Sequence, residues 1–193
     1  MYQVIGDSMK SVFNTLPEPI VNQLDSICRN PTFPWYWLDD TTYQVADSHD
    51  GIKAQSFSHQ IIDEYEPVSE QTGLFESALH CIADKCDARV SDIYRVRLGL
   101  CYPDGMLHHA PHTDYDFDHT TALYYVNEAE GDTFFFDKNR QCVDRITPKK
   151  GRAVVFDGLT LHASSMPSKN YRISLNLGYA DPQLFISNNN SWD

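Results

Sequence analysis

The C-terminal half of the chain constrains the fold most, because it alternates between short apolar strands and turns without a helical pattern. Sequences such as Pro103-Asp104-Gly105 and Gly131-Asp132 are turn signals between these strands. Strands are predicted where apolar, aromatic and β-branched residues alternate with polar ones, at 93–100, 121–127, 133–136, 142–146, 152–156 and 171–179. Many short strands joined by turns favour an antiparallel sandwich or barrel.

The first ninety residues are mixed and contain two predicted helices. In the segment 19–28, Ile20, Leu24 and Ile27 share one helical face, and Pro19 suits a first helical turn. A second helix is predicted over 70–86, short strands at 34–38 and 42–45, and a polar loop at 56–67. No linker or repeat divides the sequence. We therefore expect one mainly β domain over residues 1–193, with a helix-containing support over about 1–90 and a catalytic core over about 91–181.

Composition and charge exclude several classes of protein. The chain has 193 residues, enough for one sizeable core, and its 27 acidic against 15 basic residues give a net charge of −12. This charge opposes binding to phosphate backbones, so no nucleic-acid partner is expected. The sequence has no apolar stretch of membrane-spanning length and no signal-peptide pattern, which predicts a cytoplasmic protein without a membrane partner. An odd number of cysteines, five, favours free thiols.

His112, Asp114 and His162 are predicted to be metal ligands. His112 and Asp114 are two residues apart, so both side chains point the same way if the segment is extended. His162 lies at the edge of a later apolar strand and is the only histidine after His119. Two imidazoles and one carboxylate are the facial triad that binds non-haem Fe(II) and leaves positions open for other ligands.

Other interpretations of the same residues remain to be weighed. His112 lies in a histidine-rich stretch, 108–119, and a solvent-exposed loop histidine is one alternative. Asp114-x-Asp116-x-Asp118 begins like a calcium-binding EF-hand loop, but its sixth position is His119 rather than glycine and its twelfth is Tyr125 rather than glutamate. Catalytic zinc is the stronger competitor, because it accepts the same ligands. A side chain that could bind an oxoacid cosubstrate would favour iron over zinc.

Arg172 is the candidate for this side chain. The segment 171–178 alternates cleanly, with apolar residues on one face and Arg172, Ser174 and Asn176 on the other. A polar face in water is the ordinary interpretation of such a strand. In a barrel that binds a small dicarboxylate, the same face points inward, where a guanidinium makes bidentate hydrogen bonds to a carboxylate and Ser174 adds a hydroxyl donor. The upstream metal ligands favour the inward orientation.

Several motifs from about Tyr94 to Tyr179 resemble the prolyl 4-hydroxylase-like branch of the 2-oxoglutarate/Fe(II)-dependent oxygenases. The order and spacing of these motifs are similar to those of the hypoxia-sensing prolyl hydroxylases and their microbial relatives. The motifs are Leu100-Cys101-Tyr102-Pro103-Asp104-Gly105, His112-x-Asp114, the segments 121–127, 130–133 and 148–156, and the pair His162 and Arg172.

The resemblance implies a double-stranded β-helix, or jelly roll, braced by N-terminal helices. It implies Fe(II), 2-oxoglutarate and dioxygen as cofactor and cosubstrates, with iron on the three predicted ligands. Arg172 and Tyr125 are implied to bind the distal carboxylate of 2-oxoglutarate. Tyr102 is implied to lie near the iron, beside the cosubstrate or the substrate. The usual Gly-Gly-x is replaced here by Gly131-Asp132-Thr133.

The expected function is hydroxylation of an unactivated C–H bond, with release of succinate and CO2. A peptide prolyl residue is one candidate target, and a free small molecule is the alternative. A jelly-roll module that binds a metal or a carboxylate without catalysis is the non-enzymatic alternative. Oligomeric state and biological role are not indicated by the sequence.

Overall fold

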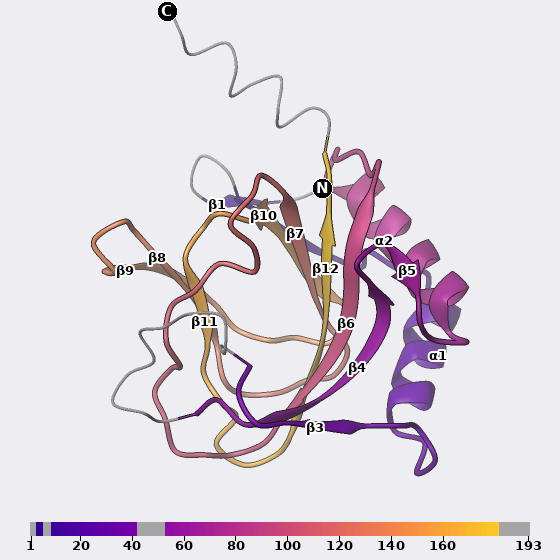
Figure 1. The fold of residues 1–193 in the computed structure, drawn as a ribbon, viewed down its shortest axis with the longest axis horizontal. Coiled ribbons are helices and arrows are strands. Elements are labelled where there is room, and N and C mark those ends of the chain that lie inside the picture. The colour runs from indigo at the N-terminus through magenta and orange to yellow at the C-terminus, as the bar shows by residue number, and fades with distance from the viewer. Residues whose placement is uncertain (1–2, 6–8, 42–52, 182–193) are drawn as a thin grey trace, which may run out of the picture.

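The computed structural model describes residues 3–5, 9–41 and 53–181, so the predicted strand at 42–45 lies outside the described residues. Within these residues there are two helices and two antiparallel sheets (Figure 1). No helix of the described residues is long and apolar enough to cross a membrane. The strands are β1 (Gln3–Ile5), β2 (Met9–Phe13), β3 (Tyr36–Leu38), β4 (Ser56–Asp63), β5 (Glu66–Pro67), β6 (Ile93–Cys101), β7 (Thr120–Tyr125), β8 (Thr133–Phe136), β9 (Cys142–Ile146), β10 (Arg152–Asp157), β11 (His162–Ser164) and β12 (Arg172–Tyr179).

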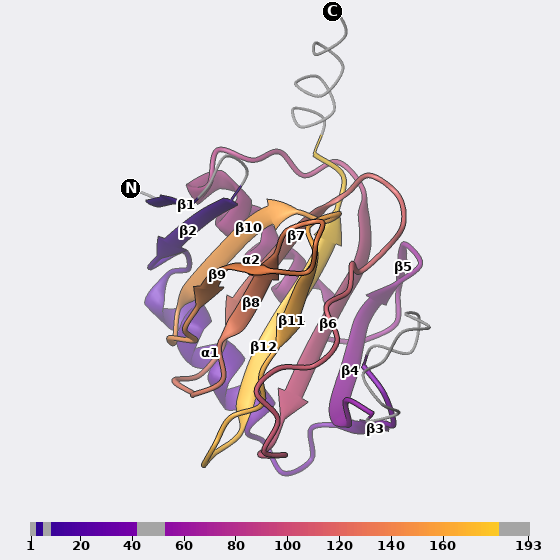
Figure 2. The ribbon, with the colours of Figure 1, turned by 90° about the vertical axis from the view of Figure 1, so that its left-hand side faces the viewer.

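The two sheets face each other as the layers of a jelly roll. The larger sheet has the order β1-β2-β10-β7-β12-β6-β4-β3, with β5 paired to β4, and the smaller has the order β11-β8-β9. Figure 2 shows the smaller sheet in front of the larger one. The predicted double-stranded β-helix is confirmed, and its strand order brings β12, from the end of the described chain, between β6 and β7.

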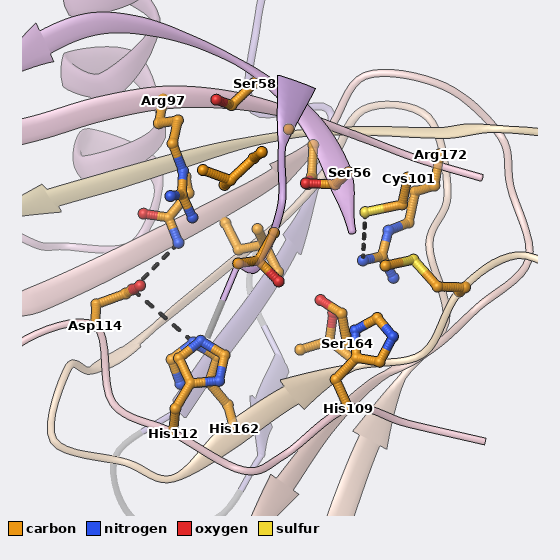
Figure 3. A pocket seen from close by; sticks show the side chains of 18 of the residues that line it. Ser56, Ser58, Arg97, Cys101, His109, His112, Asp114, His162, Ser164 and Arg172 are labelled. Atoms are coloured by element: carbon orange, nitrogen blue, oxygen red, sulfur yellow. Dashed lines mark hydrogen bonds and ion pairs between the residues drawn. The ribbon is translucent and has the colours of Figure 1, made fainter. Parts of the chain in front are cut away.

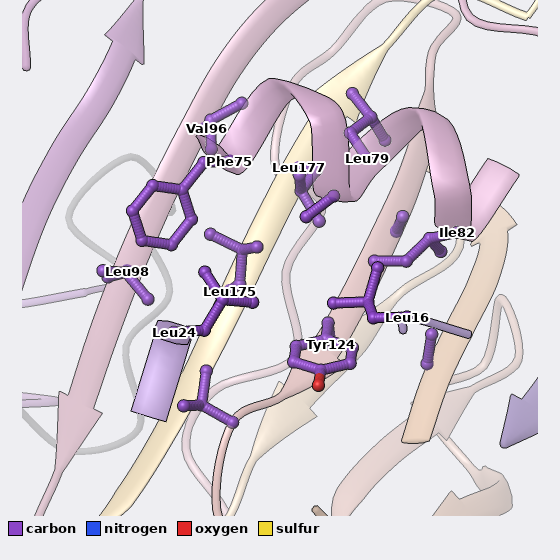
Figure 4. Close-up of a cluster of buried hydrophobic side chains, with 14 of the residues drawn as sticks. Leu16, Leu24, Phe75, Leu79, Ile82, Val96, Leu98, Tyr124, Leu175 and Leu177 are labelled. Carbon is purple, nitrogen blue, oxygen red and sulfur yellow. The ribbon is translucent and has the colours of Figure 1, made fainter. Parts of the chain in front are cut away.

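Both predicted helices are confirmed, and they cover the outer face of the larger sheet (Figure 1). α1 (Glu18–Cys28) has Pro19 in its first turn and buries Leu24 and Cys28. α2 (Thr72–Lys85) buries one apolar stripe against the sheet. The shared core contains Leu16, Leu24, Phe75, Leu79, Ile82, Val96, Leu98, Tyr124, Leu175 and Leu177 (Figure 4).

The alternation of β12 divides the molecule into an apolar side and a polar side. Leu175 and Leu177 are fully buried in the core beneath the helices. Arg172, Ser174 and Asn176 alternate with them and line a cavity on the opposite face of the sheet. The core on one face therefore fixes the orientation of the polar side chains on the other, because a register slip would reverse both faces.

The predicted polar loop at 56–67 is wrong, because residues 56–63 form β4. Ser56 and Ser58 line the cavity, whereas Ile62 packs in the core on the other face. The register of β4 against β6 shifts between Gln60 and Ile62, and both Ile61 and Ile62 lie in the core. This irregularity breaks the apolar–polar alternation, so the sequence shows no strand pattern.

Replacing Leu79 by alanine tests the support that α2 gives to the sheet. Leu79 is fully buried, so the loss of transfer free energy and the new cavity are expected to lower the free energy of unfolding by about 2–5 kcal/mol. Urea unfolding followed by circular dichroism measures this difference. The exposed Leu107 is the matched control, and Leu107→Ala is expected to leave stability nearly unchanged. Equal stability of the two variants would contradict the packing described here.

Candidate active site

A cavity lies between the two sheets and is lined by side chains from both (Figure 3). The larger sheet contributes its inner face along β4, β6 and β12. The smaller sheet contributes Thr133 from β8 and His162 and Ser164 from β11. Three of the predicted site residues meet at one end of this cavity, and Arg172 lies at the other (Figure 3).

Backbone pairing holds the two histidines side by side. His112 forms an isolated antiparallel bridge with His162, the first residue of β11. The amide of His112 donates to the carbonyl of His162 at 3.0 Å, and the reverse hydrogen bond is 2.9 Å long. Asp114 follows two residues after His112. One nitrogen or oxygen atom from each of His112, Asp114 and His162 lies within 4.8 Å of the others.

Hydrogen bonds from Nδ1 to backbone carbonyls orient both imidazoles so that Nε2 can bind a metal. Nδ1 of His112 lies 3.1 Å from the carbonyl oxygen of Ala110, and Nδ1 of His162 lies 2.9 Å from that of Thr160. A carbonyl only accepts, so Nδ1–H donates in each ring and the lone pair of the neutral ring is on Nε2. A hydrogen bond from the ring nitrogen that does not bind the metal is usual for a metal-bound histidine. The donor set therefore fits a divalent metal.

Asp114 is buried and held by three polar side chains. Arg95 donates from Nη2 to Oδ1 at 2.6 Å, while Asn176 and Thr121 donate to Oδ2 at 3.2 and 3.3 Å. Oδ2 also lies 3.9 Å from Nε2 of His162. One carboxylate oxygen is thus fixed by the ion pair with Arg95, and the other faces the histidines.

The environment of the site keeps Asp114 and His112 in the protonation states that bind a metal. Burial is the largest single effect and raises the pKa of Asp114, but the charges of Arg95, the two histidines and Arg97 together outweigh it and hold the pKa well below its usual range. Burial, followed by repulsion from His162, lowers the pKa of His112 to about 4. At neutral pH, Asp114 is a carboxylate and His112 is uncharged, as metal coordination requires.

Arg95→Met tests the support of Asp114. Partners that orient a metal ligand typically contribute 10- to 100-fold to metal affinity, so a loss of about that size is expected. The ion pair is buried, and its removal is also expected to destabilise the metal-free protein by about 3–5 kcal/mol. Metal titration and thermal unfolding measure the two effects. Unchanged affinity for Fe(II) would show that Arg95 does not contribute to metal binding through Asp114.

Arg172 is the most buried charged residue of the cavity, at 1% exposure. Its Nη1 donates to the carbonyls of Gly131 and Ser165 at 2.6 and 3.1 Å, and its Nη2 lies 3.8 Å from Sγ of Cys101. Its Nε has no hydrogen-bond partner among the described residues. No carboxylate among the described residues forms an ion pair with Arg172. A buried guanidinium without an anion is costly, so the site fits an anionic ligand.

Gly131 shapes the end of the cavity beside Arg172. Its φ of +88° is in the left-handed region, and a Cβ there would lie 2.6 Å from the carbonyl oxygen of Ser165. Only glycine fits, and the resulting turn aims the Gly131 carbonyl at Arg172.

Of the other predicted site residues, one lines the cavity and two do not. Ser174 lines it, two residues from Arg172 on β12. Tyr125 is fully buried and does not line it; its hydroxyl donates to Thr133 Oγ1 at 2.8 Å, and Thr133 does line it. Tyr102 does not line the cavity either, and its ring stacks on Trp37. The roles assigned to Tyr125 and Tyr102 stay predictions.

Sequence reasoning missed Arg95 and Arg97, and it placed Asn176 on the polar face of its strand without assigning it a role. Arg95 and Asn176 hold Asp114, and Arg97 lines the cavity beside them. The signal was present in β6, where Arg95 and Arg97 alternate with the core residues Val96 and Leu98. The alternation that singled out Arg172 would have found both arginines.

Comparison with known proteins assigns this segment to a family. Residues 99–179 match the model of the 2OG-Fe(II) oxygenase superfamily. This segment belongs to that superfamily. It contains the two histidines, Asp114 and Arg172, and the superfamily uses Fe(II), 2-oxoglutarate and dioxygen. A search among curated proteins finds no match.

Solved structures of 2OG-Fe(II) oxygenases share the fold at low sequence identity. A Burkholderia pseudomallei oxidoreductase of this family has a TM-score of 0.70 and 14% identity, over 90% of this chain and 85% of its own. A Trichoplax adhaerens prolyl hydroxylase, in complex with a hypoxia inducible factor peptide fragment, has a TM-score of 0.64 and 16% identity, over 92% and 86%. An α-ketoglutarate-dependent carbocyclase from nogalamycin biosynthesis has a TM-score of 0.62 and 13% identity, over 90% and 79%. The chain is thus similar to the prolyl hydroxylase-like branch and to other oxygenases.

Proposed function

We propose that the protein is an Fe(II)- and 2-oxoglutarate-dependent dioxygenase that hydroxylates an unactivated C–H bond. The observation that carries the proposal is the placement of buried Arg172 in the same cavity as His112, Asp114 and His162. Hydrolysis at a zinc ion on the same three ligands does not itself require a buried guanidinium, whereas the distal carboxylate of 2-oxoglutarate does require a cation. Membership of the 2OG-Fe(II) oxygenase superfamily supports the same activity.

Each cavity residue has a role in this proposal. His112 and His162 would hold the metal through Nε2, because their Nδ1 atoms face carbonyls, and Asp114 would hold it through Oδ2, which faces His162. Arg172 binds the distal carboxylate of 2-oxoglutarate, with Ser174 beside it as a hydroxyl donor. Tyr125 is a further donor for this carboxylate if its hydroxyl leaves Thr133.

The bound metal and cosubstrate supply the oxidation. Dioxygen is reduced by four electrons, two from oxidative decarboxylation of 2-oxoglutarate and two from the C–H bond. One oxygen atom enters succinate and the other the new hydroxyl group, and CO2 is released. The chain positions the reactants and excludes water, since the apolar side chains of Leu123, Phe156 and Met166 line the same cavity as the triad.

Two classes of substrate are candidates for hydroxylation. A peptide prolyl residue is favoured by the likeness to the prolyl hydroxylase-like branch, one member of which is the Trichoplax enzyme in complex with a peptide fragment. A free small molecule is favoured by the polar cavity wall and by the likeness to the carbocyclase. Tyr102, predicted to lie near the metal, would have to turn away from Trp37 to reach either substrate.

Turnover under labelled dioxygen tests the proposed function. The protein, with Fe(II) and 2-oxoglutarate under ¹⁸O₂, is expected to release succinate that carries one labelled oxygen atom. This reaction needs no knowledge of the primary substrate, because added ascorbate supplies the two electrons that the C–H bond would otherwise supply. Omission of Fe(II) and replacement of His162 by alanine are the controls. If folded protein releases no labelled succinate, the cavity is a binding module or a zinc site.

A further inference from the structure

Three tyrosines form a chain of ring contacts that leads from the metal-ligand segment to the surface. Tyr115 directly follows the ligand Asp114. Its ring centroid lies 6.2 Å from that of Tyr94, and the Tyr94 centroid lies 5.1 Å from that of Tyr65. Both distances are in the range of direct aromatic contact, about 4.5–7 Å. Tyr115 and Tyr94 are half-buried, and Tyr65 is 59% exposed.

The inner end of this tyrosine chain lies against the support of the metal ligand. The guanidinium of Arg95 lies over the Tyr115 ring, with its Cζ 5.0 Å from the ring centroid. The same guanidinium donates to Asp114 Oδ1 at 2.6 Å. Tyr115 does not line the cavity. An oxidisable ring therefore lies behind the ligand, outside the space that a substrate would fill.

A sheet irregularity places Tyr94, the middle member of the chain. Consecutive residues of β12 pair with Arg95 and with Ile93, so Tyr94 between them is the extra residue of a β-bulge. Regular alternation would put Tyr94 on the face of Val96, which lies in the core. Its ring faces Tyr115 instead. Bulges are frequent beside active sites, where they redirect a side chain in this way.

A strained turn holds Tyr65, the outer member of the chain. Glu64 and Tyr65 form the two-residue turn between β4 and β5, with φ values of +46° and +72°. Hairpin turns of this kind favour Asn-Gly, and a bulky residue is disfavoured there. The amide of Tyr65 donates to the carbonyl of Tyr94 at 3.1 Å. Such strain is concentrated at functional sites, and an exposed ring adds little to the core.

The surroundings of Tyr94 suit the loss of one electron. Burial, followed by negative charges that include those of Asp92 and Asp118, raises the pKa of Tyr94. Its phenol is therefore protonated at neutral pH, and one-electron oxidation releases the proton. The nearby carboxylates also favour removal of an electron from the ring. A half-buried ring can pass the released proton to water.

We propose that the tyrosine chain carries electrons from a reductant in solution to the metal centre when 2-oxoglutarate is decarboxylated without a primary substrate. Such a turnover leaves the centre two electrons short. Each of two transfers oxidises Tyr65 to a neutral radical and releases one proton. The two electrons and two protons convert the second oxygen atom of dioxygen to water. Ascorbate or a thiol returns one electron and one proton to the exposed Tyr65 radical each time.

This role protects the site, because the oxidant is consumed before it attacks the side chains of the cavity. The inference rests on the proposed function, since decarboxylation of 2-oxoglutarate supplies the oxidant. The chain acts after decarboxylation, so its loss does not prevent the first release of succinate. That order of events allows the two proposals to fail separately.

Turnover without a primary substrate and without a reductant tests the route. The protein receives Fe(II), 2-oxoglutarate and ¹⁸O₂, with catalase to remove hydrogen peroxide. The wild type is expected to give a tyrosyl radical signal in freeze-quench electron paramagnetic resonance, narrowed by growth on ring-deuterated tyrosine. Peptide mass spectrometry is expected to find oxidised Tyr65. In Tyr94→Phe, which keeps the ring but interrupts the chain, oxidation is expected to be lost at Tyr65 and to accumulate at Tyr115.

Tyr36→Phe is the matched control. Tyr36 is 63% exposed and lies outside the chain, so its replacement is expected to leave the oxidation of Tyr65 unchanged. Tyr36 itself is expected to stay unoxidised in the wild type. The first-turnover yield of labelled succinate is expected to be equal in all three proteins, which also shows that the variants fold. Added ascorbate is expected to abolish the accumulation of oxidised Tyr65.

Three results overturn the inference. The first is the absence of a tyrosyl radical in wild-type protein that releases labelled succinate. The second is oxidation of Tyr65 that persists in Tyr94→Phe. The third is equal oxidation of Tyr36 and Tyr65, which would indicate an oxidant that diffuses through solution. Wild-type protein that releases no labelled succinate is a different result, since it overturns the proposed function and this inference with it.

Discussion

Replacing Asp114 by alanine is expected to abolish Fe(II) binding and, with it, succinate formation. Asp114 is the only carboxylate among the three ligands, and its Oδ2 faces His162 across 3.9 Å. Two imidazoles alone bind a divalent metal weakly. The substitution also removes the carboxylate that pairs with Arg95. Fe(II) titration of the purified protein and succinate release from 2-oxoglutarate measure the two effects.

The ion pair with Arg95 complicates this substitution, because removal of one buried partner destabilises by about 3–5 kcal/mol. Asp114→Asn keeps the shape of the side chain and is the second variant, expected to fold and still lose the metal. Asp116→Ala is the matched control, since Asp116 is an exposed aspartate two residues away. Wild-type turnover in folded Asp114→Asn would exclude Asp114 from the metal site.

Replacing Arg172 by glutamine is expected to weaken 2-oxoglutarate binding while leaving metal binding intact. Loss of one partner of a buried charged pair costs about 2–5 kcal/mol, which corresponds to roughly 30- to 5,000-fold in dissociation constant. Arg172 is at the far end of the cavity from the triad, so Fe(II) affinity is the internal control (Figure 3). Calorimetric titration with 2-oxoglutarate measures the change.

Arg172→Lys and Lys169→Gln complete this test. Lysine keeps the charge but not the planar fork, so part of the affinity is expected to return. Lys169 is an exposed cation near the start of β12, and its replacement is expected to change nothing. An Arg172→Gln variant that binds 2-oxoglutarate as tightly as the wild type would place the distal carboxylate elsewhere.

Much of this site was predictable because it depends on local patterns. The spacing of His112 and Asp114 places two ligands together, and the strand alternation around Arg172 identifies a polar face. The same alternation failed for β4, whose serines face the cavity and whose register shifts between Gln60 and Ile62, so that no regular apolar period remains. Fold class followed from the run of short strands in the C-terminal half.

The rest of the site depends on pairing between distant segments. Arg95 meets Asn176 only because β6 and β12 are neighbours in a particular register, and Asp114 reaches both from the segment between β6 and β7. No local signal fixes that register. Tyr102 illustrates the same limit, since Cys101 lines the cavity and the next residue stacks on Trp37 instead. The division into a support and a catalytic core within one domain stays a prediction.

An anaerobic titration of metal-free protein with Fe(II) and 2-oxoglutarate tests the central claim most directly. Fe(II) chelated by 2-oxoglutarate has a visible metal-to-ligand charge-transfer band, so formation of the complex is seen without any primary substrate. We predict a band in the wild type, a band that needs more 2-oxoglutarate in Arg172→Ala, and none in His162→Ala. Absence of the band in folded wild-type protein would contradict the assignment of this cavity to iron and 2-oxoglutarate.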